Sequence, residues 1–375
     1  MHYQYIQEQS QLDEFLQAIS TQSVLAIDTE FMRRRTLYPE IALIQVFDGQ
    51  HLGLIDPCCD LDLSRFWQIM SDAAILKVLH SPSEDVEVFL KHGCIPSPIF
   101  DTQFALSLLG GANCLGFAIM VERFLGLTID KSESRTNWLQ RPLSASQLEY
   151  AAGDVFYLLP CFEKIRAEIE ALGFMNIVIG EGDLLVTKRA YQTPDEMLHI
   201  DINNSWQLQP AQLAVLNQLA VWRRDKAREK NLALGFILKE PTLFEIARRQ
   251  PQSMNQLRTI AGIEPMEINK SGKQILQCVE SGLAAPVETH PLKVTRLIDY
   301  PDYKKSAKLI KQKITKVAEK VGVPVDVFAS KKQINQLLSW HWKLNEQNRS
   351  HVLIPDLMTG WRSELLGETL KEWHD

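Results

Sequence analysis

An apolar run near the start of the chain continues directly into two acids, because Ser23-Val24-Leu25-Ala26-Ile27 is followed by Asp28-Thr29-Glu30. A short run of this kind predicts a buried strand. Successive residues of a strand point to opposite faces, so Asp28 and Glu30 share one face. Two carboxylates side by side repel each other, and burial increases the cost. We therefore expect a divalent cation as their counter-charge, and the pattern predicts half of a metal site.

The composition is that of a soluble protein with more than one domain. The chain has 375 residues, of which 45% are hydrophobic and 23% charged, and this length exceeds one ordinary core. No apolar stretch is long enough to cross a membrane, and the N-terminus does not resemble a secretory signal. The cysteines are scattered and lack zinc-site spacing. We expect a cytoplasmic monomer with reduced thiols and no membrane association.

Charge is divided unevenly along the chain. Residues 1–210 carry 14 Lys and Arg against 28 Asp and Glu, whereas residues 211–375 carry 26 against 18. The net charge of −6 argues against a polyanionic partner, but this division favours metal chemistry in the front half and polyanion contact in the back half. The alternative is ordinary solvated charge in both halves.

The front half alternates strand and helix patterns, which predicts an α/β domain with a mixed central sheet flanked by helices. The expected strands are Tyr3–Ile6, Val24–Phe31, Ile41–Phe47, Leu52–Ile55 and Leu76–Leu79. The expected helices are Leu12–Ile19, Leu63–Met70, Glu84–Lys91, Thr102–Leu109 and Leu115–Phe124. Short links between the strands from Val24 to Ile55 predict antiparallel pairing.

A long helix is expected to begin at Ser144 with a capping box and to end near Leu172. Pro160 within it predicts a kink or a break. We assign residues 1–175 to the α/β domain and residues 176–207 to a linker, because that stretch lacks sustained periodicity. Residues 208–290 and 291–375 read as two small all-helical units, which could be diverged copies of one module.

Acids that could complete the metal site occur at two later places. Asp85 follows a predicted strand and opens a helix, where an acid can also simply complement the helix dipole. Tyr150 and Asp154 are four residues apart and share one helix face. A packed helix with an incidental acid is the alternative there. Taken singly, neither place identifies a site.

Together these residues resemble the DEDD superfamily of 3′→5′ exonucleases, in its Tyr-containing branch. Its order of motifs is an Asp-x-Glu strand, an Asp at a helix start, and Tyr-x-x-x-Asp on a later helix. Tyr38-Pro39, Leu43-Ile44-Gln45 and Phe100-Asp101-Thr102 agree with this resemblance. The back half resembles HRDC modules in several residues, which are Trp222-Arg223, Ala227, Ile237-Leu238, Leu243, Ile246-Ala247, Pro251 and Leu257. An exonuclease domain followed by two HRDC modules is similar to the bacterial ribonuclease D family.

The resemblance implies a ribonuclease H-like exonuclease domain that uses two divalent cations, Mg²⁺ or Mn²⁺. It implies that the cations are held by Asp28, Glu30, Asp85 and Asp154, with Asp28 between them. Tyr150 would orient the attacking water, because a phenol is a poor base at neutral pH. Carboxylates are the ligands that such hard cations prefer.

Other residues are weaker candidates for substrate contact. Phe31 and Met32 could stack against a terminal base, although such residues are more often core. Gln45 could touch the terminal nucleotide or make an interior hydrogen bond. Arg135 lies in a basic, aromatic segment between Lys131 and Arg141. Lys304, Lys305 and Lys308 begin a lysine-rich helix that could bind phosphates or simply be solvated.

The leading hypothesis is a 3′→5′ exoribonuclease that releases 5′-mononucleotides. The family resemblance implies tRNA precursors with a 3′ trailer as typical partners. A DNA exonuclease with the same core is an alternative that dependence on the 2′-hydroxyl would separate. A non-catalytic RNA-binding scaffold is another, but such decay normally removes an acid and all four are present.

Overall fold

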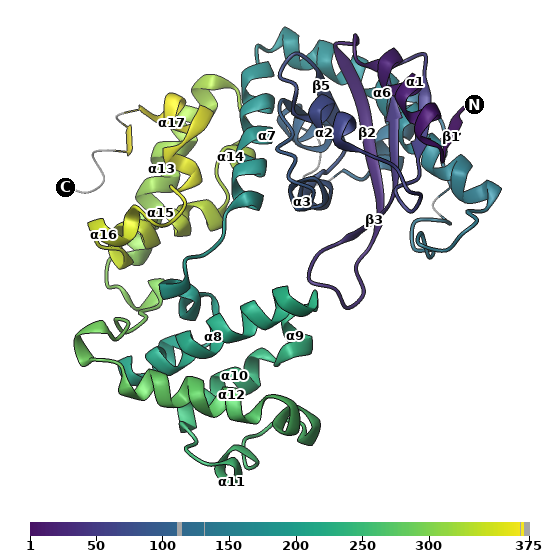
Figure 1. Cartoon of the computed structure of the whole chain (residues 1–375). Helices are drawn as coiled ribbons and strands as arrows, with labels where there is room; N and C mark the ends of the chain where they lie inside the picture. Colours follow the sequence, from purple (N-terminus) through teal and green to yellow (C-terminus); the bar gives the residue numbers. More distant parts are fainter. Residues whose placement is uncertain (111–114, 131, 368, 371–375) are drawn as a thin grey trace.

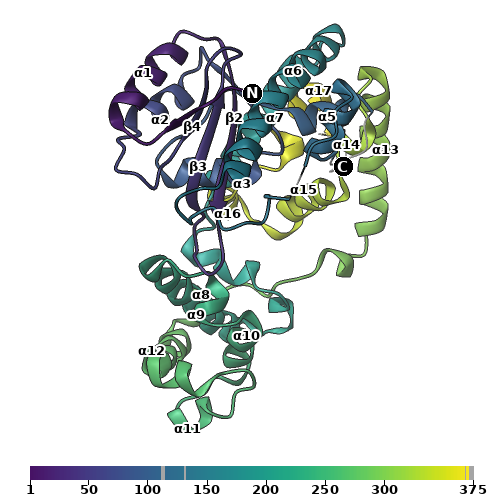
Figure 2. The same ribbon diagram turned by 90° about the vertical axis from the view of Figure 1, so that its right-hand side faces the viewer.

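The structure, a computed structural model, describes residues 1–110, 115–130, 132–367 and 369–370. It consists of an α/β domain and two helical modules (Figure 1). The second module lies beside the α/β domain and the first lies below both, as the perpendicular view of Figure 2 also shows. The expected fold class, an α/β domain followed by two all-helical units, is confirmed.

A six-stranded sheet with the order β1-β4-β3-β2-β5-β6 forms the centre of the α/β domain. The strands are β1 (Gln4–Ile6), β2 (Val24–Met32), β3 (Glu40–Phe47), β4 (Leu52–Ile55), β5 (Leu76–Leu79) and β6 (Ile99–Asp101). β3 runs antiparallel to β2 and β4, and the other three pairings are parallel. The mixed sheet and the antiparallel run from β2 to β4 are as expected, whereas β6 is not among the expected strands.

The two faces of the sheet belong to different cores, and β2 contributes to both. Leu25 and Ile27 pack into the core on one face, and Ala26 packs into the core on the other. The first face is covered by α1 (Gln9–Ile19), α2 (Ser64–Ser71) and α3 (Ser83–Lys91). The second is covered by α4 (Thr102–Leu108), α5 (Phe117–Leu125) and α6 (Ala145–Ala171). Asp28 and Glu30 alternate with Ile27 and therefore face α6.

Helix α6 begins where the capping box predicts. The Ser144 hydroxyl accepts from the Gln147 amide at 3.1 Å, and the Gln147 side chain accepts from the Ser144 amide at 3.0 Å. The helix passes Pro160 without the break that was one of the two expected outcomes. Buried small residues, Ala151, Ala152 and Gly153, let it lie close to the sheet, where it contacts β2, β3 and β4.

The expected linker over 176–207 is wrong in its first half, because α7 (Met175–Ala190) is a helix of 16 residues. Its glycines, which made it resemble a linker, are packing sites. A Cβ built on Gly182 would lie 2.6 Å from the Ile99 carbonyl oxygen of β6, and one on Gly180 would lie 3.4 Å from Trp361. The rest of the segment contains the short 3₁₀ helices Asp195–Asp201 and Ser205–Gln207.

The first helical module has a core of its own. It consists of α8 (Pro210–Lys230), α9 (Leu234–Ile237), α10 (Glu240–Arg249), α11 (Met254–Leu257) and α12 (Pro265–Ala284). Its contact with the α/β domain is the loop between β2 and β3. The Ala233 amide donates to the Arg35 carbonyl at 2.8 Å, and the Arg35 guanidinium lies 4.8 Å from the centre of the Phe236 ring.

The second helical module repeats the order of a long helix, a four-residue helix and a further helix. It consists of α13 (Tyr303–Val321), α14 (Val325–Phe328), α15 (Lys331–Lys343), α16 (Glu346–Arg349) and α17 (Gly360–Leu366). The remaining 3₁₀ turns of the chain are Val287–Thr289, Leu297–Asp299 and Asp356–Met358. Among the residues described, no helix is long and apolar enough to cross a membrane.

The second module is attached to α7 by two charge pairs, in each of which the partner from the second module is buried. Arg362, 2% exposed, pairs with Glu181, to which the Trp361 indole also donates at 3.0 Å. Lys188 reaches Asp356 at 2.7 Å. Helix α7 is therefore packed between the α/β domain on one side and the second module on the other.

Replacing Gly182 with alanine tests this packing. The added methyl would overlap the Ile99 carbonyl, so we expect a loss of about 1–3 kcal/mol in the free energy of unfolding, measured with denaturant. Gly180→Ala on the same helix is the matched control and should be neutral or stabilising by up to about 1 kcal/mol. Equal stability of the two variants would contradict the packing described.

Candidate active site

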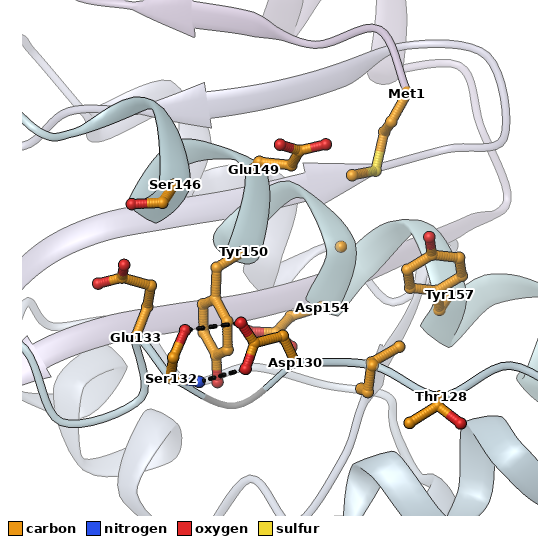
Figure 3. A pocket seen from close by; sticks show the side chains of 12 residues that line it. Met1, Thr128, Asp130, Ser132, Glu133, Ser146, Glu149, Tyr150, Asp154 and Tyr157 are labelled. Atoms are coloured by element: carbon orange, nitrogen blue, oxygen red, sulfur yellow. Dashed lines mark hydrogen bonds between the residues drawn. The ribbon is translucent and has the colours of Figure 1, made fainter.

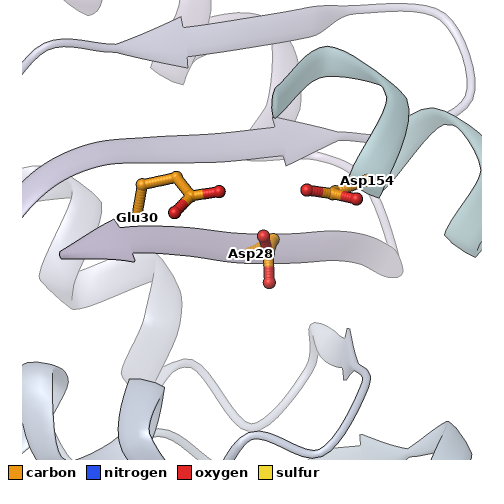
Figure 4. A group of neighbouring side chains, drawn as sticks. All are labelled: Asp28, Glu30 and Asp154. Atoms are coloured by element: carbon orange, nitrogen blue, oxygen red, sulfur yellow. The ribbon is translucent and has the colours of Figure 1, made fainter. Parts of the chain in front are cut away.

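Three carboxylates meet where α6 crosses β2. Asp28 and Glu30 come from the strand and Asp154 from the helix, and one oxygen from each lies within 4.8 Å of the others (Figure 4). The two acids of the strand occupy alternate positions. Immediately after them, between Glu30 and Phe31, the register of β2 against β3 shifts. The sequence prediction that these three acids converge agrees with this geometry.

Asp85 lies beside this cluster but not within it. It stands in the first turn of α3 and is 8% exposed, so it is a buried acid rather than a surface one. The Thr29 hydroxyl donates to its carboxylate at 2.5 Å. This bond ties Asp85 to the strand between the two acids, and the charge of Asp85 is among the causes that raise the pKa of Asp28.

Tyr150 lies one helical turn before Asp154, and both line the same two adjoining hollows of about 290 and 240 Å³. Figure 3 shows the Tyr150 ring extending from α6 into the first of these. The ring is held on one side by Trp138, whose ring centre is 6.1 Å away and which is 1% exposed. Asp28 and Glu30 line the second hollow together with Tyr150 and Asp154.

The loop between α5 and α6 forms one wall of both hollows. Asp130 lines each of them. Farther along, the Arg141 guanidinium donates to both oxygens of Asp56, at 2.7 and 2.6 Å, and to the Ala42 carbonyl at 2.6 Å. This ion pair attaches the end of the loop to the sheet. Asp130 and His80 line the site without having been predicted, because an isolated Asp or His in a loop carries no distinguishing sequence pattern.

Mutual repulsion and burial dominate the electrostatics of the cluster. Burial, and then the charge of Asp154, raises the pKa of Asp28 well above its usual range. The same two causes raise the pKa of Glu30 to about 9. Burial raises the pKa of Asp154 to about 7 and that of Asp85 to about 6, the latter despite the bond from Thr29. A divalent cation would relieve this repulsion, and the all-oxygen donor set is one that Mg²⁺ and Mn²⁺ prefer.

The other predicted contact residues lie away from the cluster, except for Gln45. Phe31 packs against the core on the far side of the sheet, and Met32 against the core on the near side. Neither lines the two hollows. Gln45 on β3 is the cross-strand partner of Asp28 on β2. It is 0% exposed, so a nucleotide cannot reach it in this structure.

The basic candidates are all exposed. Arg135 lies in the loop before α6, next to Ser134, which lines the second hollow. Lys304, Lys305 and Lys308 lie on the first turns of α13 in the second module. Lys131, the first residue of the predicted basic segment, is outside the described residues.

We expect the cation-free protein to lose stability as the pH rises from 7 to 9. A carboxyl whose folded-state pKa is raised stabilises the fold below its ordinary pKa, and that stability is lost as the pH passes the folded value. For Asp154 and Glu30 these values are about 7 and about 9. Melting temperatures in EDTA should therefore fall across this range.

In the same experiment, Asp154→Asn should flatten the pH dependence, whereas Glu168→Gln, at an exposed position of the same helix that lines neither hollow, should not. A wild-type melting temperature that stays constant or rises from pH 7 to 9 would contradict the repulsion described.

Comparison with known proteins gives the same division of the chain. Residues 3–170 match the family model described as 3'-5' exonuclease, residues 212–279 match the HRDC domain, and residues 301–370 match the ribonuclease D C-terminal HRDC domain. Ribonuclease D of Escherichia coli K12 is 44% identical over 99% of this chain and 98% of its own length. Ribonuclease D of Cronobacter turicensis is 43% identical, with 94% of each chain covered.

The same family appears among solved structures. The crystal structure of Escherichia coli RNase D, described as an exoribonuclease involved in structured RNA processing, superposes with a TM-score of 0.93. It is 43% identical, with 100% of this chain and 98% of that chain covered. With the carboxylate geometry and the order of domains, these likenesses show that the chain belongs to the ribonuclease D family of 3′→5′ exoribonucleases.

Proposed function

We propose that this chain hydrolyses RNA from the 3′ end and releases 5′-mononucleotides at the site between β2 and α6. The convergence of Asp28, Glu30 and Asp154 to within 4.8 Å is the observation that carries the proposal. Three carboxylates at this spacing repel each other strongly, and the hollow beside them is open to a substrate. Hydrolysis of a phosphodiester is the chemistry to which such a cluster is suited.

Two divalent cations, Mg²⁺ or Mn²⁺, fit the donor set. Asp28 has a carboxylate oxygen within 4.8 Å of those of both Glu30 and Asp154, and we assign it to both cations. Glu30 and Asp154 would complete the position for one cation, and Asp85 would serve the other. When bound, the pair supplies positive charge at the attacking and leaving oxygens and lowers the pKa of water.

Tyr150 orients the water that attacks the phosphodiester. Burial and the neighbouring carboxylates, Asp154 first among them, raise the pKa of Tyr150 above its usual range. The phenol therefore keeps its proton at neutral pH and acts as a hydrogen-bond partner rather than as a base. The packing of Trp138 against its ring holds this hydroxyl in place over the hollow.

The substrate class we propose is structured RNA with an unpaired 3′ end, such as a tRNA precursor with a 3′ trailer. The description of the similar Escherichia coli enzyme as one involved in structured RNA processing supports it. We propose that the protein acts as a monomer.

Replacing an acid of the cluster should abolish hydrolysis without unfolding the protein. We expect Asp154→Asn and Glu30→Gln to lower the rate by about 10³-fold or more, and Tyr150→Phe by about 10²-fold through lost positioning. The assay follows mononucleotide release from uniformly labelled tRNA precursor with Mg²⁺, Mn²⁺ or EDTA. Glu168→Gln, at an exposed position of α6 that lines neither hollow, is the matched control and should retain activity.

Matched DNA in the same assay separates the two nuclease readings. Wild-type activity in Asp154→Asn, or activity that persists in EDTA, would contradict the site. Internal cuts would contradict the exonuclease assignment, and equal rates on RNA and DNA would contradict the proposed substrate class.

The lysines of α13 should supply part of the affinity for RNA. Each phosphate contact with a single strand adds about 0.7 to the slope of log affinity against log salt. We expect a variant with Lys304, Lys305 and Lys308 changed to alanine to lower that slope by about 2, as measured by filter binding.

The double variant with Lys270 and Lys273 changed to alanine, on α12 of the first module, is the control and should keep the wild-type slope. An unchanged slope in the triple variant would exclude this turn of α13 as a contact.

A further inference from the structure

Gln45 is a fully buried polar residue for which the described structure shows no polar partner. Its side chain is 0% exposed, and neither its Oε1 nor its Nε2 atom has a hydrogen-bond partner among the described residues. Buried amides of folded proteins nearly always have partners, and leaving both groups unpaired is costly. An apolar residue would fill this position at a lower cost in folding free energy if packing were the sole requirement.

The place of Gln45 in the sheet points to the carboxylate cluster. On β3 it is the direct cross-strand partner of Asp28 on β2. Residues paired in this way have Cβ atoms about 4.5–5.5 Å apart and side chains on the same face. Its same-face neighbours on β3, Leu43 and Phe47, pack into the core beneath α6, the helix that carries Asp154.

Direct contact with substrate does not explain this residue, because its side chain is closed off from the two hollows that the other site residues line. The carboxamide nitrogen is a neutral hydrogen-bond donor. A deprotonated carboxylate that binds a cation still needs hydrogen-bond donors for its remaining lone pairs. The nearest carboxylate by sheet register is that of Asp28.

We propose that Gln45 is a positioning residue for the metal site, whose Nε2 donates to the Asp28 carboxylate when cations are bound. The proposal rests on the function proposed above, since it needs the cluster to hold cations. Gln45 acts through Asp28 and touches neither substrate nor cation. Its role is to hold that carboxylate in the orientation that cation binding requires.

Gln45→Met tests this role, because methionine has a similar length and volume and no donor. In EDTA we expect its melting temperature to equal or exceed that of wild type, since an unpaired amide has been removed. In a Mn²⁺ titration followed by melting temperature, we expect the midpoint to move to a concentration about 10–100-fold higher. At saturating Mn²⁺, kcat should fall while KM for RNA stays within about twofold of wild type.

Leu43→Met is the matched control, because it changes the core on the same strand and face and leaves the amide in place. It should keep the wild-type Mn²⁺ midpoint. If Gln45→Met binds Mn²⁺ as wild type does, or if Leu43→Met shifts the midpoint equally, the inference is overturned. Gln45→Leu replaces Gln45→Met, with the same expectations, if the methionine variant does not fold in EDTA.

The outcomes also separate this inference from the proposed function. A wild-type protein whose melting temperature does not respond to Mn²⁺ or Mg²⁺ would contradict the metal site itself. A wild-type response that Gln45→Met reproduces would leave the metal site intact and remove only the role of Gln45.

Discussion

Repulsion among carboxylates that the fold forces together is the constraint on which the rest of the site depends. Strand β2 and helix α6 are both fixed by apolar packing, and they bring Asp28, Glu30 and Asp154 to within 4.8 Å of one another. No rearrangement of side chains alone can separate acids that alternate along a central strand. The structure therefore maintains an electrostatic cost at one place, as functional sites commonly do, and hydrophobic burial on both sides of the sheet offsets it.

The parts of the site that the sequence predicts are those encoded by local spacing. Alternation along a strand places Asp28 beside Glu30, and a spacing of four places Tyr150 beside Asp154. The Ser144 capping box predicts where α6 begins for the same reason, since it involves neighbouring residues. Local spacing does not show that α6 crosses β2. The prediction that these two elements lie together therefore required the family resemblance.

The parts that the sequence does not predict depend on tertiary contacts. The glycines of α7 resemble a linker until Ile99 and Trp361 are seen packed against them. The burial of Asp85 depends on Thr29, which is 56 positions away. Gln45 has the residue type of a substrate contact, and only its complete burial shows that it is not one. In each case, the deciding neighbour is remote in the chain.

Helix α7 also has a consequence for where this protein can be divided. It lies against β6, the last strand of the sheet, whose outer side would otherwise offer unpaired backbone groups to other chains. Exposed edge strands of this kind promote pairing between molecules and aggregation. A fragment cut at residue 170, where the exonuclease family model ends, would leave that edge open. The smallest fragment that keeps this edge of the sheet covered extends to Ala190. The fragment that can be expressed alone is therefore longer than the stretch that carries the catalytic motifs.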